Sequence, residues 1–308
     1  MKVLVTGANG LVGSAITRLA QNSEHTFLFT NGKKRVDFRD ALLVNKLFTQ
    51  YKPDYVIHTA AKVGGIGGNI ACHGEYYYDN LLMNTNLIHS SYIHGVQKFI
   101  GFSSVCVFPD NIGTLSEDIM HNGQPSDFNF AYAYAKRMLD VQIEAYKRQY
   151  GIKNYCSIIL TNTFGENDMY NLEYGHVIPS LIHKLYLAKR DRQPMIIWGD
   201  GSSSREFIYS GDVAKIILEL IDTPQIPQRL IVSRNENITI REIVEKLVRI
   251  SEFDGPVIYD TSKPNGQKAR PTDISLLNNL VDIEYTDLDT ALEYSWKWFV
   301  NNYPHVRQ

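Results

Sequence analysis

Short apolar runs alternate with amphipathic segments through the first half of this chain. The apolar runs are rich in β-branched residues and cover 2–6, 26–30, 54–59, 98–104 and 153–160. The segments between them carry apolar residues at helical spacing and cover 11–21, 40–50, 77–94 and 130–150. Strands that alternate with helices form parallel βαβ units, with helices on both faces of one sheet. The pattern therefore predicts an α/β fold, a doubly wound parallel sheet of the Rossmann type.

This regular alternation ends near Gly165. Beyond that residue, turn-like segments border short elements, at 176–179, 198–201 and 263–266. They predict a smaller α/β lobe for substrate binding. A helix that opens at Asp212 and an apolar run at 230–232 return the chain to the main sheet. We predict a nucleotide-binding domain and a substrate lobe, formed respectively by 1–165 plus about 207–233, and by 166–206 plus about 234–308.

Length and charge narrow the class of protein. The 308 residues suffice for a sizeable core. The formal net charge is -2 and the basic residues are scattered, so we expect no nucleic-acid partner, and no apolar run is long enough to span a membrane. Cys72, Cys106 and Cys156 lack CxxC spacing, and the N-terminus leads straight into a strand. We therefore expect a cytoplasmic protein with a small-molecule substrate and no metal site.

The first predicted strand runs directly into a glycine-rich turn at the start of a helix. Gly7 permits the tight turn, Gly10 lets the backbone approach a phosphate, and Gly13 allows the helix to pack closely on the strand. Backbone N–H groups at a helix start bind phosphate, so we expect a dinucleotide pyrophosphate here. Its expected contacts are Gly7, Asn9, Gly10, Leu11 and Val12. A plain strand–turn–helix with packing glycines is the alternative.

The turn after the second predicted strand indicates which dinucleotide binds. An acidic residue there would accept a hydrogen bond from the ribose 2′-OH of NAD. This chain instead has a basic turn at 31–35, which offers charge-assisted donors to a 2′-phosphate. We therefore predict NADP(H), with Lys33 as the leading contact, against the alternative of a solvated basic turn. Ala60 and Ala61, after the third strand, would let the cofactor lie against the backbone.

Tyr132 and Lys136 are spaced one helical turn apart and so share a helix face. Reduction of a ketone needs a proton donor beside the oxygen that receives charge. We expect Tyr132 to be that donor, with the Lys136 ammonium lowering the phenol pKa and binding the nicotinamide ribose. Ser104, at the end of a predicted strand, would be the second donor. An ordinary helix aromatic and a strand-end hydroxyl are the alternative.

Cys106 and His176 are candidates for proton transfer at carbon. Cys106 lies two positions beyond Ser104, so strand alternation would project both side chains to one side. A thiol paired with an imidazole can remove a proton from a carbon next to a ketone, and His176 would deliver a proton from the other face. A small buried thiol and an unrelated histidine are equally weighted alternatives.

Several motifs together resemble the GDP-L-fucose synthase family of extended short-chain dehydrogenases/reductases. The resemblance spans nearly the whole chain. It rests on Ala60-Ala61-Lys62-Val63-Gly64-Gly65-Ile66, Ser103-Ser104-Val105-Cys106-Val107-Phe108-Pro109, Tyr132-x-x-x-Lys136, Thr161-Asn162, His176-Val177-Ile178-Pro179 and Trp198-Gly199-Asp200-Gly201 followed by Arg205-Glu206-Phe207. Members of this family epimerise C3 and C5 of GDP-4-keto-6-deoxymannose and then reduce C4 with NADPH.

The resemblance implies roles for individual residues. Ser104, Tyr132 and Lys136 would form the reductase set, with Cys106 and His176 as the epimerase base and acid. Asp37 would lie near the adenine ring, and His176 would also contact the cofactor. The GDP-sugar would be bound, with Arg205 suited to its diphosphate, by Ser104, Val105, Asn162, Val177, Lys184, Trp198, Arg205 and Lys268.

The chain also departs from the family pattern. Asn9 stands where fucose synthases usually have a basic residue, Phe108 replaces a tyrosine, and the double serine is shifted by one position. The stretch 110–129 matches only loosely. The sugar could therefore be a hexose or a heptose, and reduction could occur with or without epimerisation.

Other readings remain open from the sequence. A 4,6-dehydratase or 4-epimerase is disfavoured by Val105-Cys106, where dehydratases have Asp-Glu. A regulator that binds NADP without chemistry is disfavoured by the intact Ser104, Tyr132 and Lys136. The helices at 77–94 and 130–150 carry apolar residues beyond one face, namely Leu81, Leu82, Leu87, Ile88, Met138, Leu139, Val141 and Ile143. In the family that this chain resembles, such helices pair across a two-fold axis into a four-helix bundle, so the resemblance implies a homodimer, unless these residues contact the sheet.

Overall fold

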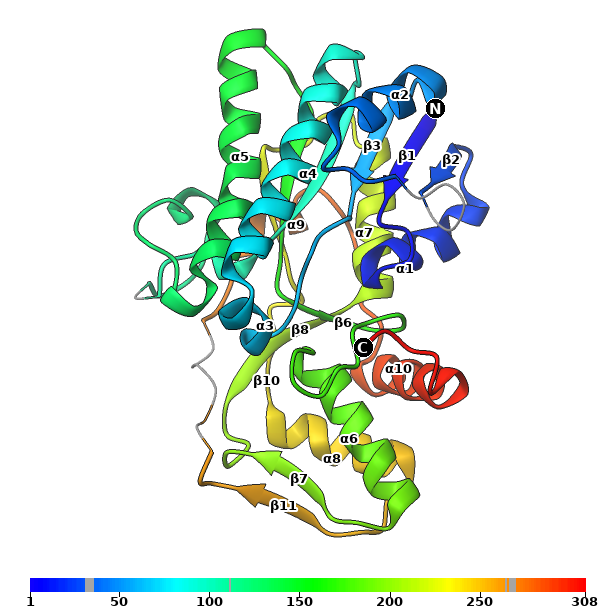
Figure 1. Cartoon of the computed structure of the whole chain (residues 1–308), viewed down its shortest axis with the longest axis vertical. Helices are drawn as coiled ribbons and strands as arrows, with labels where there is room; N and C mark the ends of the chain where they lie inside the picture. Colours follow the sequence, from blue (N-terminus) through cyan, green and yellow to red (C-terminus); the bar gives the residue numbers. More distant parts are fainter. Residues whose placement is uncertain (31–35, 111, 264, 266–269) are drawn as a thin grey trace.

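Six parallel strands form the main sheet of the computed structural model, which describes residues 1–30, 36–110, 112–263, 265 and 270–308 (Figure 1). The strand order is β2-β1-β3-β4-β5-β9. Their bounds are β1 (Lys2–Thr6), β2 (Thr26–Phe29), β3 (Tyr55–His58), β4 (Lys98–Ser104), β5 (Tyr155–Leu160) and β9 (Arg229–Val232). The order reverses beside β1, as in doubly wound folds. The predicted fold class is confirmed.

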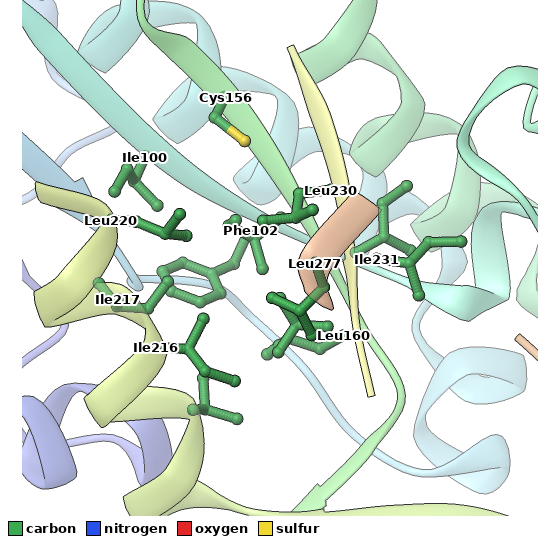
Figure 2. Packing of buried hydrophobic residues seen from close by; sticks show 14 of the residues in the cluster. Ile100, Phe102, Cys156, Leu160, Ile216, Ile217, Leu220, Leu230, Ile231 and Leu277 are labelled. Atoms are coloured by element: carbon green, nitrogen blue, oxygen red, sulfur yellow. The ribbon is translucent and has the colours of Figure 1, made fainter. Parts of the chain in front are cut away.

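Helices cover both faces of this sheet because both faces are apolar. On one side α1 (Leu11–Leu19), followed by a 3-10 turn (Ala20–Asn22), packs against α7 (Ser210–Asp222). The other side carries α2 (Ala41–Tyr51), α4 (His73–Ile93) and α5 (Phe130–Tyr150). Figure 2 shows the core under α7, where Cys156 of β5 lies among Ile100, Leu220 and Leu230. The thiol of Cys156 is therefore a core side chain.

Most predicted elements in this domain agree with the structure to within a few residues. The predicted helix at 77–94 begins earlier, at His73. A short helix, α3 (Ile66–Ala71), precedes it and was not predicted. Its sequence contains two glycines, which are poor helix formers.

The smaller lobe has its own sheets and its own core. A three-stranded sheet contains β6 (Asn162–Phe164), β8 (Ser204–Tyr209) and β10 (Asn237–Thr239), and a parallel pair joins β7 (Met195–Trp198) to β11 (Val257–Asp260). Its helices are α6 (Val177–Asp191), α8 (Ile240–Ser251) and α10 (Leu288–Asn302), while the short α9 (Ser275–Asn278) packs on the main-sheet core. Along β8, Phe207 belongs to the core of the lobe and Ile208 to that of the main sheet. We keep the predicted two-domain division as a proposal, which these separate cores support.

One turn predicted in this lobe is wrong. The segment 176–179 was interpreted as a turn, but His176 is the N-cap of the fifteen-residue helix α6. Pro179 lies in the first turn of this helix, where the missing N–H would have no partner in any case. Among the described residues, no helix is both long enough and apolar enough to cross a membrane.

Candidate active site

The glycine-rich segment forms a tight turn between β1 and α1. Gly7 has φ +70°, in the left-handed region that favours glycine, and its carbonyl accepts a 2.9 Å hydrogen bond from the N–H of Gly10. A Cβ on Gly7 would lie 2.6 Å from the backbone nitrogen of Ala60, and a Cβ on Gly13 would lie 2.2 Å from the carbonyl oxygen of Gly7. Packing of the chain alone therefore requires both Gly7 and Gly13.

Gly10 is under a weaker packing constraint. It has φ -82° and is the N-cap of α1, and the nearest atoms that a Cβ there would meet lie 3.3 and 3.8 Å away. The first N–H groups of α1 have no carbonyl one turn earlier in the helix. An anion is therefore favoured at this end of the helix, beside Gly10. The residues present fit the pyrophosphate of the predicted cofactor.

Of the other predicted cofactor contacts, Ala60 lies directly beside this turn. The N–H of Ala60 donates to Oγ1 of Thr6 at 3.3 Å, which holds the end of β3 against β1. Asp37 is exposed and forms a 2.7 Å ion pair with Arg39. Lys33 lies outside the described residues. The remaining predicted contacts are at least partly accessible, namely Asn9, Leu11, Val12 and Ala61.

A buried hydrogen-bond chain that the sequence analysis missed joins the glycine turn to α5. The ring of His58 bonds Oγ1 of Thr6 at 2.8 Å and Oδ1 of Asn84 at 3.0 Å. Burial, together with the charge of Lys136, lowers the pKa of His58 to about 3, so this ring is neutral. The Asn84 amide donates to the carbonyl of Ala135, beside Lys136. The available signal was a histidine at the end of an apolar strand.

Tyr132 and Lys136 both lie on α5. The Lys136 ammonium donates a 2.9 Å hydrogen bond to the carbonyl of Phe102 in β4 and lies 5.8 Å from the centre of the Tyr132 ring. Burial lowers the pKa of Lys136 to about 8. Burial also raises the pKa of Tyr132, and Cys106 and Tyr76 raise it further. The expectation that Lys136 lowers the phenol pKa is wrong for this structure, because burial opposes the charged form of both groups.

The chain leaves β4 at Ser104 and turns at once. Residues Val105–Val107 form one turn of 3-10 helix, and the N–H of Cys106 lies 3.4 Å from Oγ of Ser104. Cys106 therefore does not continue the strand, contrary to the expectation from strand alternation. The turn nevertheless brings the two side chains together. Burial raises the pKa of the Cys106 thiol, and a hydrogen bond with Ser104 offsets part of that rise.

A pocket lies where the segments that follow β4 meet β6 and β8. Its walls include four of the predicted site residues, namely Val105, Cys106, Asn162 and Arg205. Arg270 lines the same pocket, and the charges of Arg270 and Arg205 both act to lower the pKa of Cys106. Two guanidinium groups beside one thiol suit an anionic substrate.

Sequence analysis missed two residues that shape this pocket. Glu206 is buried and accepts hydrogen bonds from Oγ of Ser233 at 2.6 Å and from the N–H and hydroxyl of Thr272 at 2.9 and 2.6 Å. This carboxylate therefore holds the segment that carries Arg270, whose guanidinium also donates to the carbonyl of Pro109. Glu206 stands in the motif Arg205-Glu206-Phe207, which carried no role for it, and no local pattern marks Arg270, because the pocket assembles from distant parts of the chain.

His176 lies outside the walls of this pocket. Its side chain is 45% exposed, and Nδ1 lies 3.7 Å from Oδ1 of the buried Asp168. Desolvation alone would lower the pKa of His176, but the neighbouring Asp168 carboxylate outweighs it and the pKa is raised.

Three further predicted substrate residues lie on the smaller lobe. Val177 is exposed at the start of α6. The Lys184 ammonium lies 5.0 Å from the centre of the Trp198 ring, and that of Lys263 lies 5.8 Å from it. Trp198 is exposed, so it presents an aromatic face flanked by two cations. Lys268 lies outside the described residues.

Comparison with known proteins gives one consistent result. Residues 3–232 match the NAD dependent epimerase/dehydratase family. The chain is 36% identical to a probable GDP-L-fucose synthase from Drosophila melanogaster, over 100% of this chain and 99% of the relative. It is also 36% identical to the GDP-L-fucose synthase of Dictyostelium discoideum, over 99% and 97%. A GDP-L-fucose synthetase from Naegleria fowleri, crystallised with NADP, superposes with a TM-score of 0.92 at 33% identity, covering 100% of this chain and 95% of that one.

Proposed function

This chain belongs to the NAD-dependent epimerase/dehydratase family and, within it, to the GDP-L-fucose synthases, and on this premise we propose that it reduces the C4 ketone of a GDP-4-keto-6-deoxy sugar with NADPH. The resemblance found in the sequence is thereby confirmed. NADP is bound in the Naegleria fowleri structure, which supports the sequence-based prediction of NADP(H). A hexose is the favoured sugar, because the three relatives named above, at 33% to 36% identity, are fucose synthases.

This proposal is carried by the Cys106 thiol, which lines one pocket with two guanidinium groups and influences the phenol of Tyr132, a residue outside the pocket lining. Tyr132 and Cys106 are close enough for Cys106 to raise the pKa of the phenol. Cys106 in turn lines the pocket that contains Arg205 and Arg270. Lys136, the proposed ribose contact, lies one helical turn from Tyr132. A nicotinamide near Lys136 and a sugar diphosphate on the arginines would therefore meet at Tyr132.

Each side chain then has a defined task in the reduction. NADPH, when bound, supplies a hydride to C4. Burial keeps the Tyr132 phenol protonated, so it holds the proton that the C4 oxygen takes up as charge develops there. Ser104 would donate a second hydrogen bond to that oxygen. Arg205 and Arg270 would bind the diphosphate through paired N–H donors.

Cys106 is also proposed to exchange protons at C3 and C5 before the reduction. The C4 carbonyl acidifies both neighbouring carbons, and reduction removes that activation, so epimerisation comes first. Burial raises the pKa of the Cys106 thiol, but Ser104 and the charges of Arg205 and Arg270 act in the opposite direction and favour the thiolate that a base requires. His176 is the proposed proton donor because Asp168 favours its charged form. Since His176 lies outside the pocket walls, the case for epimerisation rests mainly on the thiol.

Product analysis in deuterated water tests both activities. With NADPH and GDP-4-keto-6-deoxymannose, we expect NMR to find a C4 alcohol that carries deuterium at C3 and C5. Cys106→Ser should slow the deuterium exchange by about 100-fold or more while reduction continues. Cys72→Ser, outside the pocket, is the matched control and should behave as the wild type. A deuterium-free product from the wild type would leave a reductase without epimerase activity, and no NADPH oxidation would contradict the reductase.

A homodimer through α4 and α5, which lie side by side (Figure 1), is proposed from the apolar side chains that these helices expose. Leu87, Ile88, Leu139 and Ile143, which contributed to the prediction, are buried against the sheet. Other apolar side chains on the same helices are exposed, namely Tyr77, Tyr78, Ile93, Phe130, Val141 and Tyr150. Side chains from both helices also line an apolar surface pocket, among them Tyr77, Phe130 and Met138. A second copy of the chain would cover this surface.

Sedimentation checks the dimer. The wild type should sediment at twice the chain mass of 35.1 kDa. Tyr78→Glu combined with Val141→Glu should convert it to a monomer, because two charges would be buried at the interface. Leu42→Glu is the control, since Leu42 on α2 is 81% exposed outside this surface. A wild type that is monomeric at micromolar concentration would refute the dimer.

A cytoplasmic location is inferred from the state of the thiols. Cys72, Cys106 and Cys156 form no disulfide, and free thiols persist in a reducing compartment. The proposed role of Cys106 also depends on a reduced thiol.

A further inference from the structure

The C-terminal segment after α10 returns to the neighbourhood of the glycine turn. The N–H of Tyr170 donates a 2.8 Å hydrogen bond to the carbonyl of Arg307, and Met169 pairs with Arg307 in a parallel β-bridge. Val306 packs against the core of the smaller lobe. In Figure 1 the C-terminus lies below α1, next to β6. Backbone contacts therefore fix the place from which the Arg307 side chain extends.

The guanidinium of Arg307 lies at the N-terminal end of α1. Its Nη1 is 3.8 Å from the position that a Cβ on Gly10 would take. Within the described part of the chain, it forms no ion pair, and its hydrogen bond to the carbonyl of Asn167 is long, at 3.5 Å. Most of its N–H donors therefore remain available beside Gly10.

Among the described residues, the glycine turn itself contains no cationic side chain. Residues 7–13 carry no charged side chain. Arg18 of α1 forms a 3.2 Å ion pair with Glu166. Arg307 also exerts its charge on His176, another predicted cofactor contact, where it opposes the rise in pKa. A pyrophosphate bound here would carry two negative charges, which the partial charge of the helix end offsets only in part.

We propose that Arg307 binds the pyrophosphate of the nicotinamide cofactor from the C-terminal end of the chain. A guanidinium offers paired N–H donors that match phosphate oxygens, and Arg307 lies beside Gly10, the glycine of the turn that is least crowded by the rest of the chain. This inference rests on the proposed function, which requires the dinucleotide to bind at this turn. It assigns to the last residues of the chain a role in cofactor affinity.

Binding of nucleotides, measured by fluorescence titration and competition at low salt, tests the proposal. Arg307→Gln keeps the backbone contacts to Met169 and Tyr170 but removes the charge. It should raise the Kd for NADPH and for NADH by the same factor, about 10-fold, because both contain the pyrophosphate. The Kd for adenosine 2′-monophosphate, which lacks the pyrophosphate, should stay unchanged. Arg307→Lys should recover part of the lost affinity.

Arg190→Gln is the matched control. Arg190 lies near the far end of α6, about 21 Å along the helix axis from His176. Because Arg190 also interacts with Tyr303 of the C-terminal segment, an unchanged Kd in this variant would show in addition that loosening that segment does not account for the effect of Arg307→Gln. Equal NADPH affinity in Arg307→Gln and wild type would overturn the proposal. An equal loss of affinity for adenosine 2′-monophosphate would also overturn it, because Arg307 would then act on the 2′-phosphate. A wild type that binds no NADPH would instead contradict the proposed function.

Discussion

Replacing Tyr132 by phenylalanine is expected to lower kcat for ketone reduction by about 100- to 10,000-fold. The aromatic ring and its packing on α5 remain, so only the proton that the C4 oxygen takes up is lost. Burial raises the pKa of this phenol and keeps it protonated, and the nearby Cys106 raises the pKa further. The Kd for NADPH should change little, because the pyrophosphate site at the glycine turn is untouched.

Tyr134→Phe is the matched control for this prediction. Tyr134 lies two residues further along α5 and lines the apolar surface pocket rather than the pocket of Cys106. Its variant should keep wild-type kcat. Single-turnover oxidation of NADPH with GDP-4-keto-6-deoxymannose gives the rates, and near-normal turnover by Tyr132→Phe would remove this phenol from the mechanism.

Replacing Lys136 by methionine is expected to reduce kcat about 100-fold or more and, at pH 7, to stabilise the fold. The loss of rate follows because the ammonium would no longer hold the nicotinamide ribose beside Tyr132. The gain in stability follows from burial, which lowers the pKa of Lys136 from 10.5 to about 8. A shift of this size corresponds to a cost of about 3 kcal/mol for keeping the ammonium in the folded protein. Losing the hydrogen bond to Phe102 offsets part of the gain.

The pH dependence of the free energy of unfolding distinguishes the loss of a buried charge from other changes in packing. Below pH 8 the lysine is charged in both the folded and unfolded chains, so the whole burial cost is present. Between pH 8 and 10.5 the unfolded chain binds more protons than the folded one, so wild-type stability rises relative to the variant. Urea unfolding should therefore give Lys136→Met a larger stability advantage at pH 7 than at pH 10. Lys147→Met, exposed on the same helix, is the control. An equal difference at both pH values would contradict the prediction.

The main sheet could be predicted because its strands must be apolar on both faces. Val3, Leu4 and Val5 are all fully buried, with alternate side chains in the cores on opposite sides of the sheet. Such runs stand out from the amphipathic helices between them. The segment 66–71 contains two glycines and shows no such apolar run. Its Gly68 packs closely on the next helix, because a Cβ there would lie 2.8 Å from the hydroxyl of Tyr76. This short helix depends on close packing against a neighbour rather than on its own helix propensity.

The candidate site was predictable only where its geometry is local. The spacing of Gly7 and Gly13 reflects a turn and a helix–strand contact within a few residues, and the Tyr132–Lys136 spacing reflects one turn of a helix. The orientation of Cys106 was argued from strand alternation, and that argument failed because β4 ends at Ser104. The effect of Lys136 on the phenol also failed, because burial of both groups decides their pKa values.

By itself, the sequence determined the α/β fold, the glycine turn, the tyrosine–lysine pair and the family to which the chain belongs. These features are encoded in hydrophobic periodicity and in spacings of a few residues, which survive without any knowledge of distant contacts. Only the tertiary structure decided that Arg270 joins Arg205 beside Cys106, that His176 lies outside that pocket, and that Arg307 reaches Gly10. Those arrangements depend on how separate segments pack together, and packing between distant segments leaves no periodic signal along the chain.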